Sequence, residues 1–301
     1  MPRTVWNRFF LGMALITSLA LLIWIAGTRA VAQDTFTGEW TATVSKDNSK
    51  IHLNLERKNS KHGRNQMGQS FEFSDLQGLQ AVSGGPVNFS LVREAGRVEM
   101  EGSFQNGRGS GTFRFIGNPS FISAMKSRGF DFESNPDDED RDTESRLFAA
   151  TTLNVTTALA DDLNSAGLGK LQVEDLFKAA IFKVNSQFIR EMKASGYQNL
   201  GMEELVKARI FKIDPEFVRQ VSQMGFEKEP FESLVKMQIF KVTPEFVTEM
   251  RNEGLNNLEI EDLVKLRIFK IDTDFIRAAK SDGVPMEVER LVQRKIGVAR
   301  R

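Results

Sequence analysis

Ile210-Phe-Lys-Ile-Asp-Pro-Glu-Phe-Val-Arg219 is the stretch that decides the fold, because it recurs along the chain at an interval of 29 residues. A period of this size is typical of stacked supersecondary units. Two phenylalanines and a following glycine return in register with each copy. These positions are Phe182, Phe211, Phe240 and Phe269; Phe188, Phe217, Phe246 and Phe275; and Gly167, Gly196, Gly225, Gly254 and Gly283.

Residues 214–239 show what one unit contains. Asp214 is suited to cap a helix and Pro215 to occupy its first position, and Gly225 accepts the positive φ that ends a helix. After a short loop, a second helix is predicted from about Phe231 to Ile239. The other units place a cap residue at the same position: Asn185, Thr243 and Asp272.

The second helix of each unit carries a glutamate four residues before a lysine. This order predicts an ion pair within the helix worth about 0.2–0.5 kcal/mol. A solvated helix face explains the pattern, and the alternative is a lysine row for an acidic partner. The pairs are Glu174 and Lys178, Glu203 and Lys207, Glu232 and Lys236, and Glu261 and Lys265.

Helices this short cannot bury their apolar faces alone, so neighbouring units must stack. The phenylalanine columns are therefore predicted to form a continuous core, because aromatic side chains bury large areas. The alternative is that they line an aromatic ligand groove.

Composition narrows the class of protein. The 301 residues are 41% hydrophobic, with 40 basic and 40 acidic side chains and no cysteine. Near-neutral charge argues against binding of nucleic acid. Without cysteine, the folds must be stabilised by packing and not by disulfides or thiol chemistry.

Residues 1–32 have the pattern of a secretory signal peptide or an N-terminal anchor. Arg3 and Arg8 precede an apolar run over residues 9–27, and small residues end at Ala32. The run approaches the length that spans a bilayer, so cleavage and retention both remain open. The pattern predicts an exported chain, periplasmic or anchored at the outer face of the inner membrane, that contacts membrane only through residues 9–27 if uncleaved.

Residues 34–116 change from helical periodicity to alternation of polar and apolar side chains. Asn106-Gly107 between alternating runs is a strong hairpin signal. Six or seven antiparallel strands are expected, in a small sandwich or a partial barrel. The fold class is therefore predicted as α+β, in which this β domain precedes a solenoid-like array of two-helix, 29-residue units over residues 117–297.

Two segments depart from the regular repeat. Residues 131–144 are an acidic insertion in which Asp138, Asp140 and Asp142 alternate as in a calcium loop, although the glycine such a loop requires is missing. Residues 284–297 are predicted to be a polar capping repeat. Relative to the preceding unit, four polar or small residues replace apolar ones there: Glu287, Glu289, Gln293 and Gly297.

Motifs that carry chemistry are absent from the sequence. His52 and His62 stand apart from any ligand cluster, and no metalloprotease, phosphate-loop or nucleophile motif is present. We therefore predict no catalytic, cofactor-binding or metal-binding residues, and a chain that is not an enzyme.

The repeats resemble a known group of bacterial sequences. The relevant residues are Val242-Thr-Pro-Glu-Phe-Val-Thr-Glu-Met-Arg-Asn-Glu-Gly254 with Asp262-Leu-Val-Lys-Leu-Arg-Ile268, and, upstream, Phe89-Ser-Leu-Val-Arg-Glu-Ala-Gly96. They are similar to the repeats and β segment of extracytoplasmic extensions of penicillin-sensor-type membrane zinc metallopeptidases. The resemblance covers most of residues 36–297 and implies architecture. The zinc motif and membrane spans of the peptidase are absent here, so its activity is not implied.

Two functions are consistent with these patterns. The first is a non-catalytic exported interaction protein that binds a peptide or protein partner, with envelope sensing or signalling as its expected setting. The alternative is a binder of a small lipophilic ligand, with the β domain as a cup. The side chains expected to line that cup are Trp40, Phe71, Phe73, Phe89 and Phe104.

Overall fold

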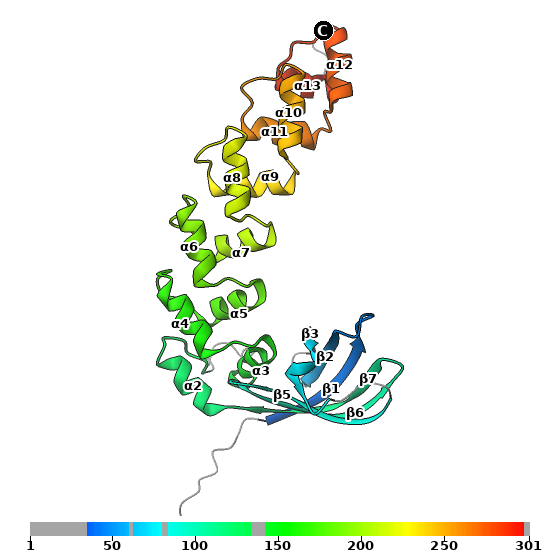
Figure 1. The fold of residues 1–301 in the computed structure, drawn as a ribbon, viewed down its shortest axis with the longest axis vertical. Helices are drawn as coiled ribbons and strands as arrows, with labels where there is room; N and C mark the ends of the chain where they lie inside the picture. Colours follow the sequence, from blue (N-terminus) through cyan, green and yellow to red (C-terminus); the bar gives the residue numbers. More distant parts are fainter. Residues whose placement is uncertain (1–34, 60–62, 80–83, 134–141, 298–301) are drawn as a thin grey trace, which may run out of the picture. The chain divides into compact units, whose positions relative to one another are not determined.

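The structure is a computed structural model that describes residues 35–59, 63–79, 84–133 and 142–297. It divides into two compact units, one ending at Pro119 and one beginning at Ser120, with residues 93–95 counted in the second. The predicted α+β fold is confirmed: a β domain comes first and a helical array follows (Figure 1). The leader, residues 1–32, lies outside the described residues.

The β domain is a single antiparallel sheet of seven strands in the order β3-β2-β1-β7-β6-β5-β4. The sheet curls into a half-barrel, so the partial barrel is correct and the sandwich is not (Figure 1). A 3₁₀ turn, η1, covers Phe73–Asp75. The strands are β1 (Thr35–Val44), β2 (Lys50–Asn59), β3 (Gly63–Glu72), β4 (Leu76–Gln77), β5 (Gly85–Arg93), β6 (Gly96–Gln105) and β7 (Arg108–Gly117).

Turn chemistry and close packing determine the register of the sheet. Asn106 and Gly107, with φ of 51° and 73°, join β6 to β7 as predicted. Gly102 and Gly111 face each other across this hairpin, and Trp40 lies opposite Gly111 on β1. A Cβ at Gly102 would lie 2.7 Å from the Trp40 ring, so only glycine leaves room for the indole.

The array consists of six helix pairs in the described part of the chain, each a first helix followed by a second. Figure 1 shows the pairs following one another along the array. The first helices are α2 (Pro119–Lys126), α4 (Thr157–Ser165), α6 (Ser186–Ala194), α8 (Pro215–Gln223), α10 (Pro244–Asn252) and α12 (Thr273–Ser281). The second helices are α3 (Thr143–Leu153), α5 (Val173–Phe182), α7 (Met202–Ile210), α9 (Phe231–Ile239), α11 (Ile260–Ile268) and α13 (Val288–Lys295).

Local chemistry begins and ends these helices as the sequence predicts. The Asp214 carboxylate accepts the backbone N–H of Phe217 at 2.8 Å, and Asn185 and Asp272 cap their helices in the same way. Gly225 has φ of 93°, and the N–H of the next residue, Phe226, returns to the Val221 carbonyl. Each cap stabilises a helix by about 1 kcal/mol.

The interior of the array is mostly aliphatic. Leucines of successive second helices and β-branched residues that precede the first helices are completely or nearly completely buried. Stacking of the second helices encloses them, as between α5 and α7 and between α9, α11 and α13. The buried positions are Leu176, Leu205, Leu234 and Leu263, and Ile213, Val242 and Ile271.

The last unit corrects one prediction. α13 begins at Val288, 28 residues after Ile260 begins α11, so this unit is one residue short of the period. Counting by 29 therefore matched polar residues such as Gln293 to apolar positions. In the structure Val288, Leu291 and Val292 fill the apolar positions and are buried, so α13 packs on the array like the other second helices.

Within the described residues, no helix has the length and apolar character needed to cross a membrane.

Candidate functional site

The aromatic side chains predicted to line a ligand cup fill the interior of the β domain. Trp40, Phe71, Phe89 and Phe104 are 1–4% exposed. The Trp40 ring lies 5.3 Å from that of Phe89 and 5.6 Å from that of Phe104, and its indole N–H donates to the Glu101 carbonyl at 3.1 Å. Phe73 is half-buried in η1. Trp40, Phe89 and Phe104 therefore pack on one another and do not line an open apolar cup.

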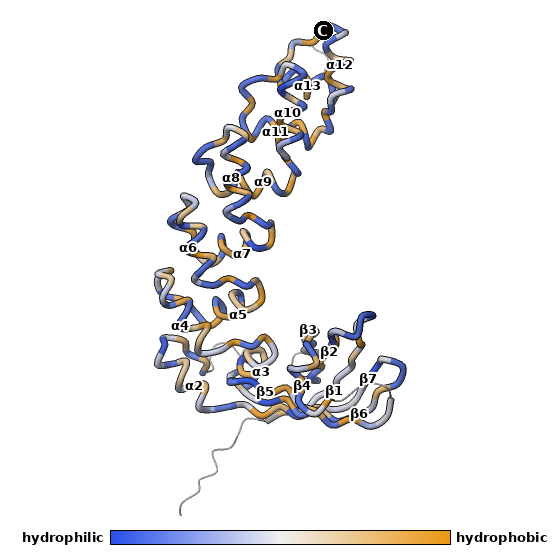
Figure 2. Tube along the Cα trace, viewed as in Figure 1, coloured by the Kyte–Doolittle hydropathy of each residue, from blue (hydrophilic) through white to orange (hydrophobic). Residues whose placement is uncertain are grey.

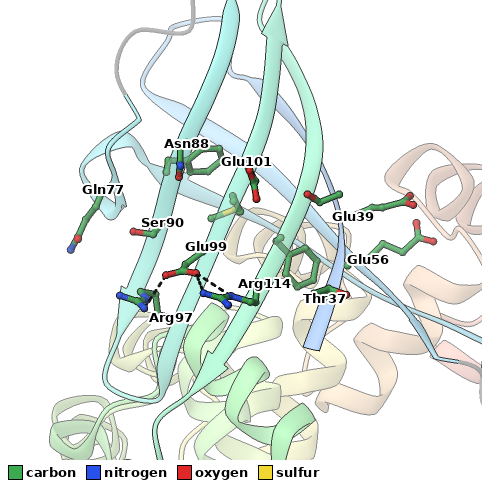
Figure 3. Close-up of a pocket in the computed structure, with 15 residues that line it drawn as sticks. Thr37, Glu39, Glu56, Gln77, Asn88, Ser90, Arg97, Glu99, Glu101 and Arg114 are labelled. Carbon is green, nitrogen blue, oxygen red and sulfur yellow. Dashed lines mark hydrogen bonds and ion pairs between the residues drawn. The ribbon is translucent and has the colours of Figure 1, made fainter. Parts of the chain in front are cut away.

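An open pocket of about 1040 Å³ lies instead over the polar side of the sheet (Figure 3). Phe89 is the member of the predicted cup that lines it. Its polar lining comes from alternate positions of β1, β5, β6 and β7, as expected where successive side chains point to opposite faces. The polar residues include Thr37, Glu39, Asn88, Ser90, Arg97, Glu99, Glu101, Thr112 and Arg114.

Glu99 is the centre of this pocket's charge. Its carboxylate lies 2.9 Å from the Arg97 guanidinium and 2.8 Å from that of Arg114, which is directly opposite on β7. Figure 3 shows both contacts as dashed lines. A cross-strand pair of opposite charge stabilises a sheet. The two arginines are about half exposed, so the contacts are those of a solvated surface pair.

The remaining candidates for chemistry have structural positions or lie outside the described residues. His52 is exposed, and its Nδ1 lies 3.3 Å from the Ser70 hydroxyl. Asp142 caps α3 by accepting the Ser145 N–H at 2.5 Å. His62, Asp138 and Asp140 lie outside the described residues. Across those that are described, no three His, Cys, Asp or Glu side chains gather as a metal site would require.

The repeated phenylalanines contribute to the core of the array, but most of them are only half-buried and pack against its buried aliphatic residues. Phe188 and Phe246 are buried, but Phe217 and Phe275 are half-buried. All four members of the other column are also half-buried: Phe182, Phe211, Phe240 and Phe269. Three of these four, Phe211, Phe240 and Phe269, are the C-cap residues of their helices.

Cations stack on the two buried rings. The guanidinium carbon of Arg209 lies 3.7 Å from the ring centroid of Phe188, and that of Arg267 lies 3.7 Å from that of Phe246. Arg209 also donates to the Lys183 carbonyl of the preceding unit at 2.8 Å. Burial lowers the pKa of Arg267 from its ordinary value. The two stacking contacts join the first and second helices of one unit, and the bond from Arg209 to Lys183 connects adjacent units. The guanidinium groups cover the two rings, so a groove of free aromatic faces is not formed there.

The glutamates and lysines of the second helices pair between units and not within helices. Lys207 Nζ lies 2.6 Å from Glu232, and Lys236 Nζ lies 2.5 Å from Glu261, each 25 residues along the chain. The same pairs join Lys178 to Glu203 and Lys265 to Glu289. The sequence spacing of 25 was visible, but a spacing of four was equally present. Because the second helices stack, the glutamate of the next unit lies closer to the lysine ammonium than the glutamate of the same helix does.

A row of exposed isoleucines was not predicted from the sequence. Ile181, Ile210, Ile239 and Ile268 occupy the same position near the C-termini of the second helices α5, α7, α9 and α11, and Ile296 follows α13. They are 48–54% exposed, although most other apolar side chains of the array are buried. The signal that could have revealed them is the tripeptide Ile-Phe-Lys, which recurs unchanged in four units.

Each of the four isoleucines on α5, α7, α9 and α11 is followed by a half-buried phenylalanine and an exposed lysine. We call these four tripeptides the Ile-Phe-Lys stripe. It comprises residues 181–183, 210–212, 239–241 and 268–270. Figure 2 shows hydrophobic segments recurring from one helix pair to the next. The stripe therefore presents apolar and basic groups together at a regular interval.

Comparison with known proteins adds no relative to this description. No protein-family model, curated protein or solved structure matches the chain.

Proposed function

We propose that this chain is a non-catalytic interaction protein whose helical array binds a peptide or protein partner. The observation that carries the proposal is the regular row of half-exposed isoleucines on the second helices. Single exposed apolar residues are normal on a protein surface, but an apolar patch edged by polar residues marks an interaction site. Five isoleucines in equivalent positions along a stacked array make such a patch. Repeat arrays commonly use extended surfaces of this kind for binding.

The recurring Asp and Glu side chains of the array support a role in binding without catalysis. Asp214 caps a helix, and Glu232 and Glu261 pair with lysines of the preceding unit. These carboxylates therefore have structural roles that explain their recurrence without a reaction. In the β domain, Glu99 is paired with Arg97 and Arg114.

The proposal includes export of the chain. It rests on the sequence of residues 1–32, in which arginines precede an apolar run and small residues end at Ala32. We expect the array and the β domain to act in the periplasm or at the outer face of the inner membrane. Mass spectrometry of the mature N-terminus tests this: a chain beginning at Gln33 indicates cleavage, and an intact leader indicates an anchor. Protection of the chain from external protease in spheroplasts would contradict export.

The binding of a lipophilic ligand in the β domain has weaker support. Its expected lining, including Trp40 and Phe104, is packed against itself, and the open pocket is lined mainly by polar side chains. We therefore assign binding to the array.

Site-specific cross-linking in living cells tests the proposed function. A photoreactive amino acid replaces Ile210 or Ile239 in the stripe, and in matched controls it replaces the exposed Glu216 or Glu245 on first helices. Illumination should produce one adduct of the same mass from both stripe positions and none from the controls. Adducts that form equally at all four positions, or at none, would contradict the proposal.

A further inference from the structure

The four lysines of the stripe follow the C-termini of their helices and, unlike the lysines within those helices, have no carboxylate partner among the described residues. Lys207 and Lys236 each contact a carboxylate of the next unit. Lys212 and Lys241, five residues later in the same units, are exposed, and no carboxylate among the described residues lies within ion-pair distance of their ammonium groups. Lys183 and Lys270 share this condition. One row of lysines thus forms ion pairs between units, and the ammonium groups of the other row are available to solvent or to a partner.

The backbone does not explain why these residues are lysine. All four adopt the left-handed conformation, with φ of 58°, 55°, 53° and 51° along the stripe. Glycine is the usual residue there, with asparagine the common substitute. Asn154 occupies the equivalent position at the end of α3, with φ of 55°. The C-terminal end of a helix dipole favours a cation, but it does not require an exposed isoleucine beside it.

The contacts between units make the stripe continuous. Arg209 donates to the carbonyl of Lys183, and Gln238 donates to that of Lys212 at 3.3 Å. Each contact ties one second helix to the stripe residue of the preceding unit. Together with the lysine–glutamate pairs, these bonds hold successive tripeptides in register. A partner that follows the array therefore meets the same three side chains at every unit.

Charge indicates what kind of partner fits. The second helices α7, α9, α11 and α13 each carry an exposed glutamate in their first turn. In α9, Glu232 precedes Ile239 by seven residues, or about 10 Å along the helix. Glu232 pairs with Lys207 of the preceding unit and Lys236 pairs with Glu261 of the next, which leaves Lys241 as the unpaired cation. A broad anionic surface such as a membrane would meet the acidic row as well as the basic one. A narrow chain lying along the stripe would meet the unpaired cations and the isoleucines.

We propose that the Ile-Phe-Lys stripe binds an acidic, amphipathic peptide segment of another protein. Apolar side chains of the segment would cover the isoleucines and the exposed sides of the phenylalanines, and its Asp or Glu carboxylates would pair with Lys183, Lys212, Lys241 and Lys270. This inference rests on the proposed function and adds the surface and the chemistry of the partner.

Selection from a library of random short peptides tests the inference on the full chain. The native chain is the bait, and the counter-bait carries Lys183→Asn, Lys212→Asn, Lys241→Asn and Lys270→Asn. Asparagine tolerates the left-handed backbone, as at Asn154, so this variant should fold. Selected peptides should be enriched in Asp and Glu interspersed with apolar residues. They should bind the counter-bait about tenfold more weakly or worse, and added salt should weaken their binding to the native chain.

A matched control replaces the paired row, with Lys178→Asn, Lys207→Asn, Lys236→Asn and Lys265→Asn. It removes the same number of charges from the same four units and should retain most of the peptide affinity at a temperature where it is folded. A further variant, Ile210→Ser with Ile239→Ser, should weaken the same peptides although it leaves every lysine in place.

Several outcomes would overturn the inference. Selected peptides without excess acid, or peptides that bind the counter-bait equally well, would show that the unpaired lysines do not select the partner. Binding of the native chain to phosphatidylglycerol vesicles, with loss of that binding in the counter-bait, would assign the stripe to a membrane surface. If cross-links form at Ile210 and Ile239 while no acidic peptide is selected, the proposed function survives and this partner chemistry is wrong.

Discussion

The β domain and the helical array stabilise their folds through contacts of different range along the chain. In the β domain, the Trp40 indole donates to the Glu101 carbonyl, 61 residues away, and β1 pairs with both β2 and β7. In the array, the ion pair between Lys207 and Glu232 spans 25 residues, and the bond from Arg251 to the Met224 carbonyl spans 27. A lesion in the sheet should therefore affect all its strands, whereas a lesion in the array should affect one unit and its neighbours.

Phe104→Ala should have the largest effect. Phe104 is 3% exposed and packs on Trp40 at the centre of the sheet. Removing its ring should lower the free energy of unfolding of the β domain by about 3–5 kcal/mol. Urea unfolding followed by tryptophan fluorescence measures this. Hydrogen exchange should accelerate in β1 and β7 as well as in β6.

Phe104→Leu is the control, because it keeps an apolar side chain and should lose less stability. If Phe104→Ala accelerates exchange in β6 and nowhere else, the sheet is not the cooperative unit that its long-range pairing indicates.

Leu234→Ala should lower stability by a similar or somewhat smaller amount, but the faster hydrogen exchange should be confined to neighbouring units. Leu234 is completely buried between units, and its truncation should reduce stability by about 2–5 kcal/mol. Hydrogen exchange with mass spectrometry should show faster exchange in α9 and the adjacent helices, and little change in α4 and α5. Gln223→Ala, at an exposed position of α8, provides the control. Equal acceleration throughout the array would contradict nearest-neighbour coupling.

Asp214→Ala tests a contact that lies within a single unit. The Asp214 carboxylate caps α8, and its loss should reduce stability by about 1 kcal/mol. Thermal unfolding by circular dichroism is a suitable measurement. Asp214→Asn retains an acceptor and should stay near the native value. The cap is not the cause if alanine and asparagine reduce stability equally.

The lysine–glutamate pairs should have the smallest effect, because the glutamates are exposed and the lysines are only half-buried, so water screens the pairs. The hydrogen bond to the glutamate of the next unit raises the pKa of Lys178, Lys207 and Lys265 above the ordinary value of 10.5. A raised pKa in the folded state contributes stability that is fully present below that ordinary value. This contribution is lost as pH rises through the raised pKa.

The triple variant Lys178→Met, Lys207→Met and Lys265→Met tests this contribution. Its unfolding temperature should lie below that of the native chain at neutral pH and low salt. The difference should shrink in high salt and above about pH 11, where the native lysines also lose their charge. A difference that is independent of both salt and pH would indicate lost packing of the lysine stems and not lost ion pairs.

Most of the repeat unit could be predicted because its signals are local. Asp214, Pro215 and Gly225 act on the backbone within a few residues of themselves, so their roles can be read in order along the chain. The same holds for Asn106-Gly107, whose positive φ angles make the turn between β6 and β7. The 29-residue period also predicted stacking, since two short helices cannot bury an apolar face alone.

The choice among equivalent partners could not be predicted in this way. Lys207 has a glutamate four residues before it and another 25 residues after it, and both spacings recur at Lys178 and Lys236. The second helices are apolar on several sides, so periodicity could not distinguish buried Leu234 from exposed Ile239. The last unit is one residue shorter than the others, so counting by 29 aligned its residues one position away from the equivalent positions of α11.

The sequence by itself determined the two-helix unit, its caps, its period and the hairpin of the β domain, because turn and capping preferences act over a few covalent bonds. Only the tertiary structure decided that Trp40 and Phe104 fill the sheet, that lysines pair across units, and that the isoleucines face water. The physical reason is that burial and ion pairing depend on which surfaces approach in space, and a repeating pattern offers several approaches of equal spacing along the chain.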